Sequence, residues 1–102
     1  MIKRIVKLSF DPANVETFLT VFEESKSRII TSPGCRHLEL LRDEKQSNVF
    51  FTYSIWETEA ALNYYRHSEF FAATWKKTKA LFNDEPQAWS LTSVETVKTS
   101  VR

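Results

Sequence analysis

Residues 33–56, with the sequence PGCRHLELLRDEKQSNVFFTYSIW, contain two strand-like segments joined by a polar turn. Apolar and polar side chains alternate from Cys35 to Asp43, and Glu44 to Asn48 are all polar. The segment from Val49 to Trp56 is dense in aromatic and β-branched residues, which is typical of a strand covered on both faces. This pattern predicts a β-hairpin in the middle of the chain.

The sequence before the hairpin predicts a strand followed by a helix. Ile2 to Phe10 alternates as a strand does, and apolar residues from Val15 to Ile29 recur at helical spacing. Asn14 is the expected N-cap of this helix. Ser32-Pro33-Gly34 is expected to end it, because Pro cannot continue a helix and Gly permits the chain to reverse.

The sequence after the hairpin predicts a broken helical region and a last strand. Thr58 is the expected cap of a short helix through about Arg66, Ser68 caps a second helix, and Ala88 to Val97 forms the strand. The resulting order is β-α-β-β-α-β. It predicts a single α+β, ferredoxin-like domain over residues 1–102, with a four-stranded antiparallel sheet and both helical segments on one face.

The other face of this predicted sheet has no helix to cover it. The alternation places five apolar side chains there, namely Ile5, Leu41, Phe51, Tyr53 and Ile55. That is too much apolar surface to leave in water, and two copies packing their sheets together would bury it. We therefore expect a homodimer that associates through its sheet faces.

Composition narrows the classes of partner and compartment. The formal net charge is +1 with both signs interspersed, so we expect no nucleic-acid partner. The single Cys cannot form an internal disulfide, no apolar run is long enough to span a bilayer, and the amino terminus lacks the apolar core of a signal peptide. We expect a cytoplasmic protein with no membrane partner.

Four segments carry a resemblance to a known family, namely Pro33-Gly34-Cys35, Leu40 to Asp43, Trp56-Glu57 and Tyr65 to Phe71. In this order and at this chain length, they resemble the antibiotic biosynthesis monooxygenase (ABM) domain family over nearly the whole sequence. The resemblance implies a dimeric α+β barrel of ferredoxin-like subunits. It also implies one of two activities, cofactor-independent oxidation of aromatic polyketide-type substrates or oxidative degradation of heme.

The resemblance also points to candidate catalytic residues. Trp56 matches a Trp of the family's substrate pocket, where an indole stacks on an aromatic substrate and offers one N–H donor; alternatively, it is a core Trp that anchors helix to strand. Thr52 lies on the same strand face and stands where the quinone-forming branch has a polar amide, although Thr is also a common strand residue. Tyr65 is expected to stack or donate.

An aromatic cluster surrounds the predicted helix break. Tyr64, Tyr65, Phe70, Phe71 and Trp75 crowd together there, either as core or, beside Trp56, as the mouth of a pocket. From this set and the preceding strand we predict that a small aromatic ligand contacts four residues: Trp56, Phe50, Phe71 and Trp75.

Two departures from the family pattern disfavour heme degradation. Trp75 stands where that branch has its axial His, and indole cannot ligate iron; Val6 or Lys7 stands where that branch has an Asn. The family also often carries one His near position 65 and another near position 70, whereas both places are aromatic in this chain; its His67 is expected to be exposed at the helix break. We predict no cofactor and no metal site.

Cys35, His37 and Glu39 form an alternating row on the first hairpin strand. Leu38 and Leu40 are expected to face the helices, so His37 and Glu39 should face the dimer interior. They are interpreted as a hydrated polar row, with His37 as a minor candidate for proton transfer. Cys35 is expected to be a small packed side chain.

Three functions follow from these patterns. The leading hypothesis is a cofactor-independent monooxygenase that acts on a small planar phenolic or quinol-type substrate and lets the substrate's own anion reduce dioxygen. The alternative is a non-catalytic dimer of the same fold that binds a small ligand or serves a stress-related role. A third hypothesis is an isomerase that uses His37 and Glu39 as an acid–base pair.

Overall fold

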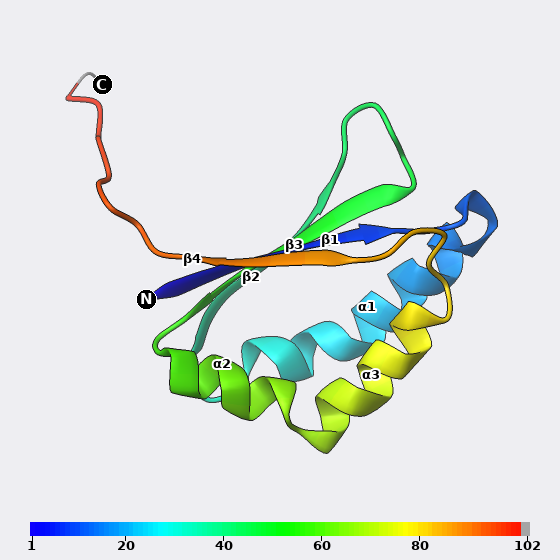
Figure 1. Cartoon of the computed structure of the whole chain (residues 1–102), viewed down its shortest axis with the longest axis horizontal. Coiled ribbons are helices and arrows are strands. Elements are labelled where there is room, and N and C mark those ends of the chain that lie inside the picture. Colours follow the sequence, from blue (N-terminus) through cyan, green and yellow to red (C-terminus); the bar gives the residue numbers. More distant parts are fainter. Residues whose placement is uncertain (101–102) are drawn as a thin grey trace.

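Four antiparallel strands form one sheet, and the helices lie together on one of its faces (Figure 1). This computed structural model describes residues 1–100. The elements are β1 (Ile2–Ser9), a 3-10 turn η1 (Pro12–Asn14), α1 (Val15–Ile30), β2 (Cys35–Arg42), β3 (Val49–Trp56), α2 (Glu59–Arg66), α3 (Glu69–Lys79) and β4 (Gln87–Leu91). The predicted ferredoxin-like order and the break in the second helical region are confirmed. No helix in residues 1–100 is long and apolar enough to cross a membrane.

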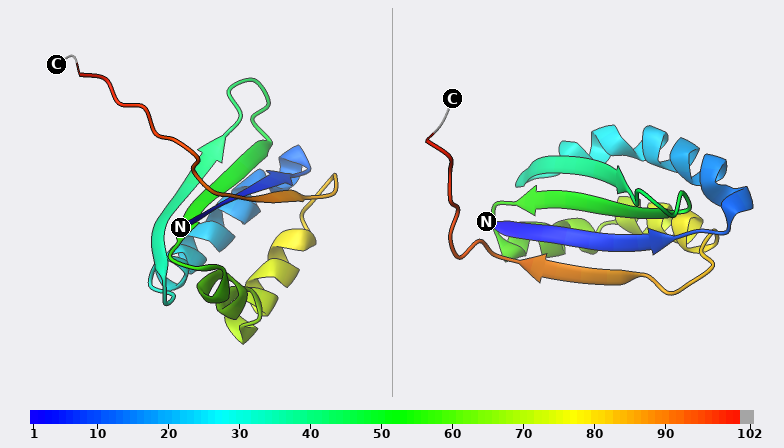
Figure 2. Two further views of the ribbon diagram at one scale, coloured as in Figure 1. Left: turned by 60° about the vertical axis from the view of Figure 1, so that its left-hand side comes forward. Right: turned by 90° about the horizontal axis from the view of Figure 1, so that it is seen from above.

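The sheet order is β2-β3-β1-β4, which Figure 2 shows from above. Directly opposed residues of antiparallel strands point to the same face, so side chains form rows across the sheet. One such row, on the helix-facing side, joins Leu38 of β2, Ser54 of β3, Arg4 of β1 and Ser90 of β4. Leu38, Ser54 and Arg4 of this row line a cavity between the sheet and the helices.

The core is aromatic and lies where α1 begins. Phe10 is fully buried, and its ring stacks on Phe18 with 4.2 Å between centroids. Phe18 in turn contacts Phe50 at 5.2 Å, and Leu8 is buried in the same cluster. These large side chains pack α1 against the sheet. The cavity between the sheet and the helices α2 and α3 lies outside this cluster.

The expected helix caps are partly confirmed. The Thr58 and Ser68 hydroxyls accept hydrogen bonds from the backbone N–H groups of Ala61 at 3.0 Å and Phe71 at 3.1 Å. Asn14 occupies the N-cap position of α1, but its side chain makes no capping bond. Its amide donates instead to the Leu81 carbonyl at 3.3 Å, which ties α1 to the segment after α3.

Two strand predictions need correction. The last strand is Gln87–Leu91 rather than 88–97, because its pairing with β1 ends at Lys3–Leu91 and β1 extends only one residue further, to Ile2. A register shift between Cys35 and His37 also pairs Cys35 with Trp56. Cys35 therefore lies on the helix-facing side, whereas an unbroken alternation would have put it beside His37.

The helix-free face of the sheet is largely apolar. Opposed pairs such as Ile5 with Tyr53 and Leu41 with Phe51 confirm the predicted faces. The same face also carries Lys3 and Lys7 of β1, and His37 and Glu39 of β2, whose side chains lie 3.0 Å apart. Its apolar side chains are Ile5, Leu41, Phe51, Tyr53, Ile55, Trp89 and Leu91. Leu41 and Trp89 each remain 42% exposed in the single chain.

Candidate functional site

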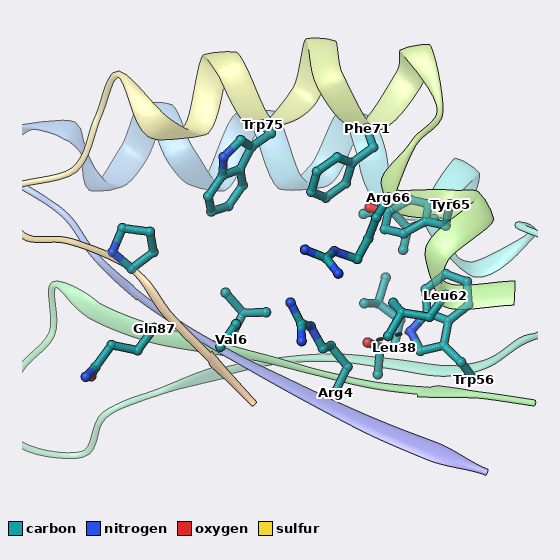
Figure 3. A pocket seen from close by; sticks show the side chains of 14 residues that line it. Arg4, Val6, Leu38, Trp56, Leu62, Tyr65, Arg66, Phe71, Trp75 and Gln87 are labelled. Atoms are coloured by element: carbon teal, nitrogen blue, oxygen red, sulfur yellow. Dashed lines mark hydrogen bonds between the residues drawn. The ribbon is translucent and has the colours of Figure 1, made fainter. Parts of the chain in front are cut away.

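A cavity of about 290 Å³ lies between the sheet and the helices α2 and α3 (Figure 3). This volume is near the lower end of the range typical of small-molecule sites. Nine of its lining residues are apolar: Val6, Ile29, Leu38, Trp56, Leu62, Phe71, Trp75, Pro86 and Ala88. The others are Arg4, Ser54, Tyr65, Arg66 and Gln87. Among residues 1–100, no carboxylate and no His lines the cavity.

Aromatic rings from three elements form one side of the cavity. Tyr65 of α2 stacks on Trp56 of β3 with 4.9 Å between ring centroids, and Phe71 of α3 meets Tyr65 edge-on at 5.2 Å. Phe71 and Trp75 are nearly parallel at 5.9 Å. Ser68 is the N-cap of α3 and so sets where the helix begins. With this start, Phe71 and Trp75 both point into the cavity (Figure 3). The cavity therefore offers flat apolar surfaces that suit a planar ligand.

The Trp56 indole is held from within the protein. Its side chain is only 1% exposed, and its Nε1–H donates to the Ser54 hydroxyl at 2.9 Å. The expectation that this N–H is free to contact a ligand is therefore wrong. Ser54 accepts that bond, which leaves its own O–H as the donor that can reach the cavity.

Tyr65 brings a neutral phenol to the cavity. Burial, with a smaller contribution from the nearby Cys35, raises the pKa of Tyr65 to about 12. Tyr65 thus stays protonated well above neutral pH. Within residues 1–100 its hydroxyl makes no hydrogen bond, so it is available as a donor to a bound molecule.

Two arginines face the same cavity and were not singled out by the sequence. Arg4 extends from β1 and Arg66 from the last turn of α2 (Figure 3). Burial, followed by repulsion from the Arg66 charge, lowers the pKa of Arg4 below its ordinary value. The sequence does contain a signal for Arg4, because Arg4 is the one charged residue among the apolar even-numbered positions of β1. Arg66 follows Leu62 by four residues and so shares its helix face.

The remaining predicted site residues lie outside this cavity. Thr52 lines a smaller neighbouring cavity of about 100 Å³, which shares Tyr65, Phe71 and Trp75 as walls. Phe50 is a core residue, 2% exposed, and does not reach either cavity. His37 lies on the opposite face of the sheet, as expected, with its ring 5.3 Å from Tyr53. His67 is exposed at the end of α2, and its Nδ1 contacts the Asn63 carbonyl oxygen at 2.7 Å.

Cys35 is the one thiol near the site. Its Sγ lies 3.7 Å from the His37 carbonyl, and burial raises its pKa, so it remains a thiol at neutral pH. In the part of the chain that the structure describes, no three His, Cys, Asp or Glu side chains gather in a way that could hold a metal ion.

The fold and the cavity define a ferredoxin-like α+β protein with an aromatic-walled pocket between its sheet and helices. The family model for antibiotic biosynthesis monooxygenase matches residues 1–77, and the chain belongs to this family. The match ends before β4, which adds Gln87 and Ala88 to the cavity.

Solved structures share this fold. An antibiotic biosynthesis monooxygenase superposes with a TM-score of 0.87 at 21% identity, over 93% of this chain and 100% of the other. A Caulobacter crescentus protein that carries the family's name gives 0.85 at 22%, over 92% and 90%. One from Deinococcus radiodurans gives 0.87 at 14%, over 99% and 100%. No curated protein is significantly similar in sequence.

Proposed function

We propose that the protein is a monooxygenase that oxidises a small planar phenolic or quinol-type substrate with dioxygen and without a cofactor. The observation that carries this proposal is the cavity between Trp56, Tyr65, Phe71 and Trp75, which combines flat apolar walls with a few polar groups. Membership of the antibiotic biosynthesis monooxygenase family supports the reaction class.

In the proposed reaction the protein supplies shape, desolvation and hydrogen bonds. The ring of the substrate lies against Phe71 and Trp75, and the hydroxyls of Tyr65 and Ser54 donate to its oxygen atoms. The substrate anion passes one electron to dioxygen, and the two radicals combine to a peroxide. For a substrate with a CH₂ group beside its ring, loss of water then gives the quinone. One oxygen atom of O₂ enters the product and the other leaves as water.

Oxygen uptake with a panel of quinols, anthrones and flavonoids tests this proposal. We expect turnover that needs only dioxygen, survives chelators and shows no flavin absorbance. The rate should rise with pH through the ionisation of the bound substrate, because the anion is the electron donor. His37→Ala should change the rate less than about twofold, because the sheet separates His37 from the cavity. A large loss from His37→Ala would instead move the chemistry to the other sheet face and favour an isomerase.

One observation favours the non-catalytic alternative: in the part of the chain that the structure describes, no carboxylate or His lines the cavity. A general base is therefore missing, and a substrate that does not ionise on its own would bind without reacting. Under this alternative the panel compounds bind, but no oxygen is consumed with any of them.

We also propose that the protein is a homodimer formed through the helix-free sheet face. Phe51, Tyr53, Ile55 and Trp89 make this face apolar, and in a dimer it would be removed from water. The proposed association is independent of the cavity, which lies on the helix side of the sheet.

Phe51→Asp is expected to convert the dimer to a monomer, because it replaces a large apolar ring of the proposed interface with a carboxylate that would have to leave water, even with Lys7 opposite it on β1. Sedimentation at micromolar concentration measures this. Lys77→Asp, on an exposed position of α3, is the matched control and should remain dimeric. Equal behaviour of the two variants would contradict the assignment of the interface, and a monomeric wild type would contradict the dimer itself.

A further inference from the structure

Two cationic side chains from separate elements enter one largely apolar cavity. Arg4 comes from the centre of the sheet, and Arg66 comes from the end of α2, 62 positions later in the chain. Figure 3 shows both guanidinium groups pointing into the space in front of Phe71 and Trp75. Arg4 is half-buried, whereas Arg66 is exposed and marks the side of the cavity that is open to solvent.

Neither charge is neutralised within residues 1–100. The ion pairs of the described chain join Lys26 with Glu23, Arg36 with Glu57 and His37 with Glu39, all away from the cavity. Of the described side chains, only the neutral Ser90 hydroxyl accepts a hydrogen bond from Arg4, at 2.9 Å. Holding two like charges beside an apolar cavity is unfavourable for the empty protein. A bound anion would relieve the repulsion and accept hydrogen bonds from both guanidinium groups.

The other polar groups are donors as well. The Tyr65 hydroxyl is neutral and without a partner in the described chain, and the Ser54 oxygen already accepts a hydrogen bond from Trp56, while its O–H remains free to donate. Ser54 lies directly opposite Arg4 in the β1–β3 pair. The polar side of the cavity is therefore built almost entirely of donors, which suits an oxygen atom that carries negative charge.

We infer that Arg4 and Arg66 hold the ionised oxygen of an aromatic ligand whose ring lies against Phe71 and Trp75, so that the substrate class is a phenol that binds as its phenolate. The identity of the anion as the substrate's phenolate rests on the proposed function. The two arginines also compensate for the missing general base, because two positive charges favour ionisation of the substrate itself.

The sign of the effect separates this arrangement from an ordinary apolar pocket. Removal from water disfavours the charged form of a phenol and raises its pKa, whereas nearby positive charge lowers it. If the two arginines act as inferred, the pKa of a bound phenol falls below its value in water. If they do not, the apolar walls raise it.

The probe is 7-hydroxycoumarin, whose ionisation is visible in its absorbance, with 7-methoxycoumarin as the neutral counterpart. Titrations of both into the intact protein at several pH values give the affinity for each form. We expect the anion to bind at least about tenfold more tightly than 7-methoxycoumarin, and the pKa of the bound probe to fall by about one unit or more, since one unit corresponds to a tenfold preference.

Matched variants assign the effect to the two residues. Arg66→Gln and Arg4→Gln should each remove most of the preference for the anion and leave the affinity for 7-methoxycoumarin within about twofold. Arg28→Gln is the control, because Arg28 is also an exposed arginine in the last turn of a helix but lies outside the cavity. Thermal unfolding checks that each variant is folded, and Arg4→Lys, which keeps the charge, should retain much of the preference.

The inference is wrong if the anion binds no better than 7-methoxycoumarin to the wild type, including the case in which neither binds. It is also wrong if Arg66→Gln behaves like Arg28→Gln. These measurements involve no oxidation. Anion preference without oxygen uptake would contradict only the proposed function, and oxygen uptake without anion preference would contradict only the role of the arginines.

Discussion

Replacing Trp56 by Ala is expected to abolish substrate binding at the cavity and to lower the free energy of unfolding by about 3–5 kcal/mol, the usual range for truncating a buried aromatic side chain to Ala. Trp56 is almost completely buried and forms the stacking partner of Tyr65. Without the indole, Tyr65 loses its support from the sheet. The Ser54 hydroxyl, which is itself buried, loses its hydrogen-bond donor.

Two further variants separate these contributions. Trp56→Phe keeps an aromatic ring against Tyr65 but removes the N–H, so it should retain part of the binding and cost less stability. Tyr64→Ala truncates an exposed aromatic residue of the same helix, 69% exposed and outside the cavity, and should change neither quantity appreciably. Urea unfolding and binding of 7-hydroxycoumarin measure the two effects. Binding by Trp56→Ala at the wild-type affinity would show that the cavity is not the ligand site.

Local sequence signals were sufficient to predict most of the elements. The hairpin of β2 and β3 follows from alternation around a polar turn, and the caps Thr58 and Ser68 mark where α2 and α3 begin. These features depend on residues close together in sequence. The aromatic wall was predictable for the same reason, because Tyr65, Phe71 and Trp75 lie within one short segment.

The features that the sequence did not reveal depend on contacts between distant segments. Arg4 and Arg66 share a cavity only because β1 is central in the sheet and α2 crosses that end of it. The end of β4 is set by where β1 begins, and the side on which Cys35 lies is set by an irregularity in its pairing with β3. Phe50 belongs to the core because Phe10 and Phe18 occupy the space beside it.

Gly34 places α2 against the end of the sheet that carries the cavity. Its φ angle is +83°, a conformation that other residues rarely adopt. Its carbonyl accepts a hydrogen bond of 2.8 Å from the Glu57 N–H, at the end of β3. A Cβ atom at Gly34 would lie 2.6 Å from the Cβ of Ala61 in α2, which is too close for two carbon atoms. The approach of α2, and with it the positions of Tyr65 and Arg66, depends on the missing side chain.

Gly34→Ala is therefore expected to be destabilising for two independent reasons. The left-handed backbone costs roughly 1–2 kcal/mol for a residue with a Cβ, and crowding in a packed region typically costs about 1–3 kcal/mol. A double-mutant cycle with Ala61→Gly separates them, because that change removes the second Cβ but leaves the backbone angle. Gly34→Ala should then cost only the conformational part, and the cycle should give a coupling energy of about 1–3 kcal/mol, as expected for residues in contact. Equal costs in both backgrounds would show that α2 does not pack on Gly34 as closely as the structure has it.

If the added Cβ displaces α2, Gly34→Ala should also weaken binding of the 7-hydroxycoumarin anion, since Arg66 lies at the end of that helix. Ala61→Gly should restore this binding in the double variant.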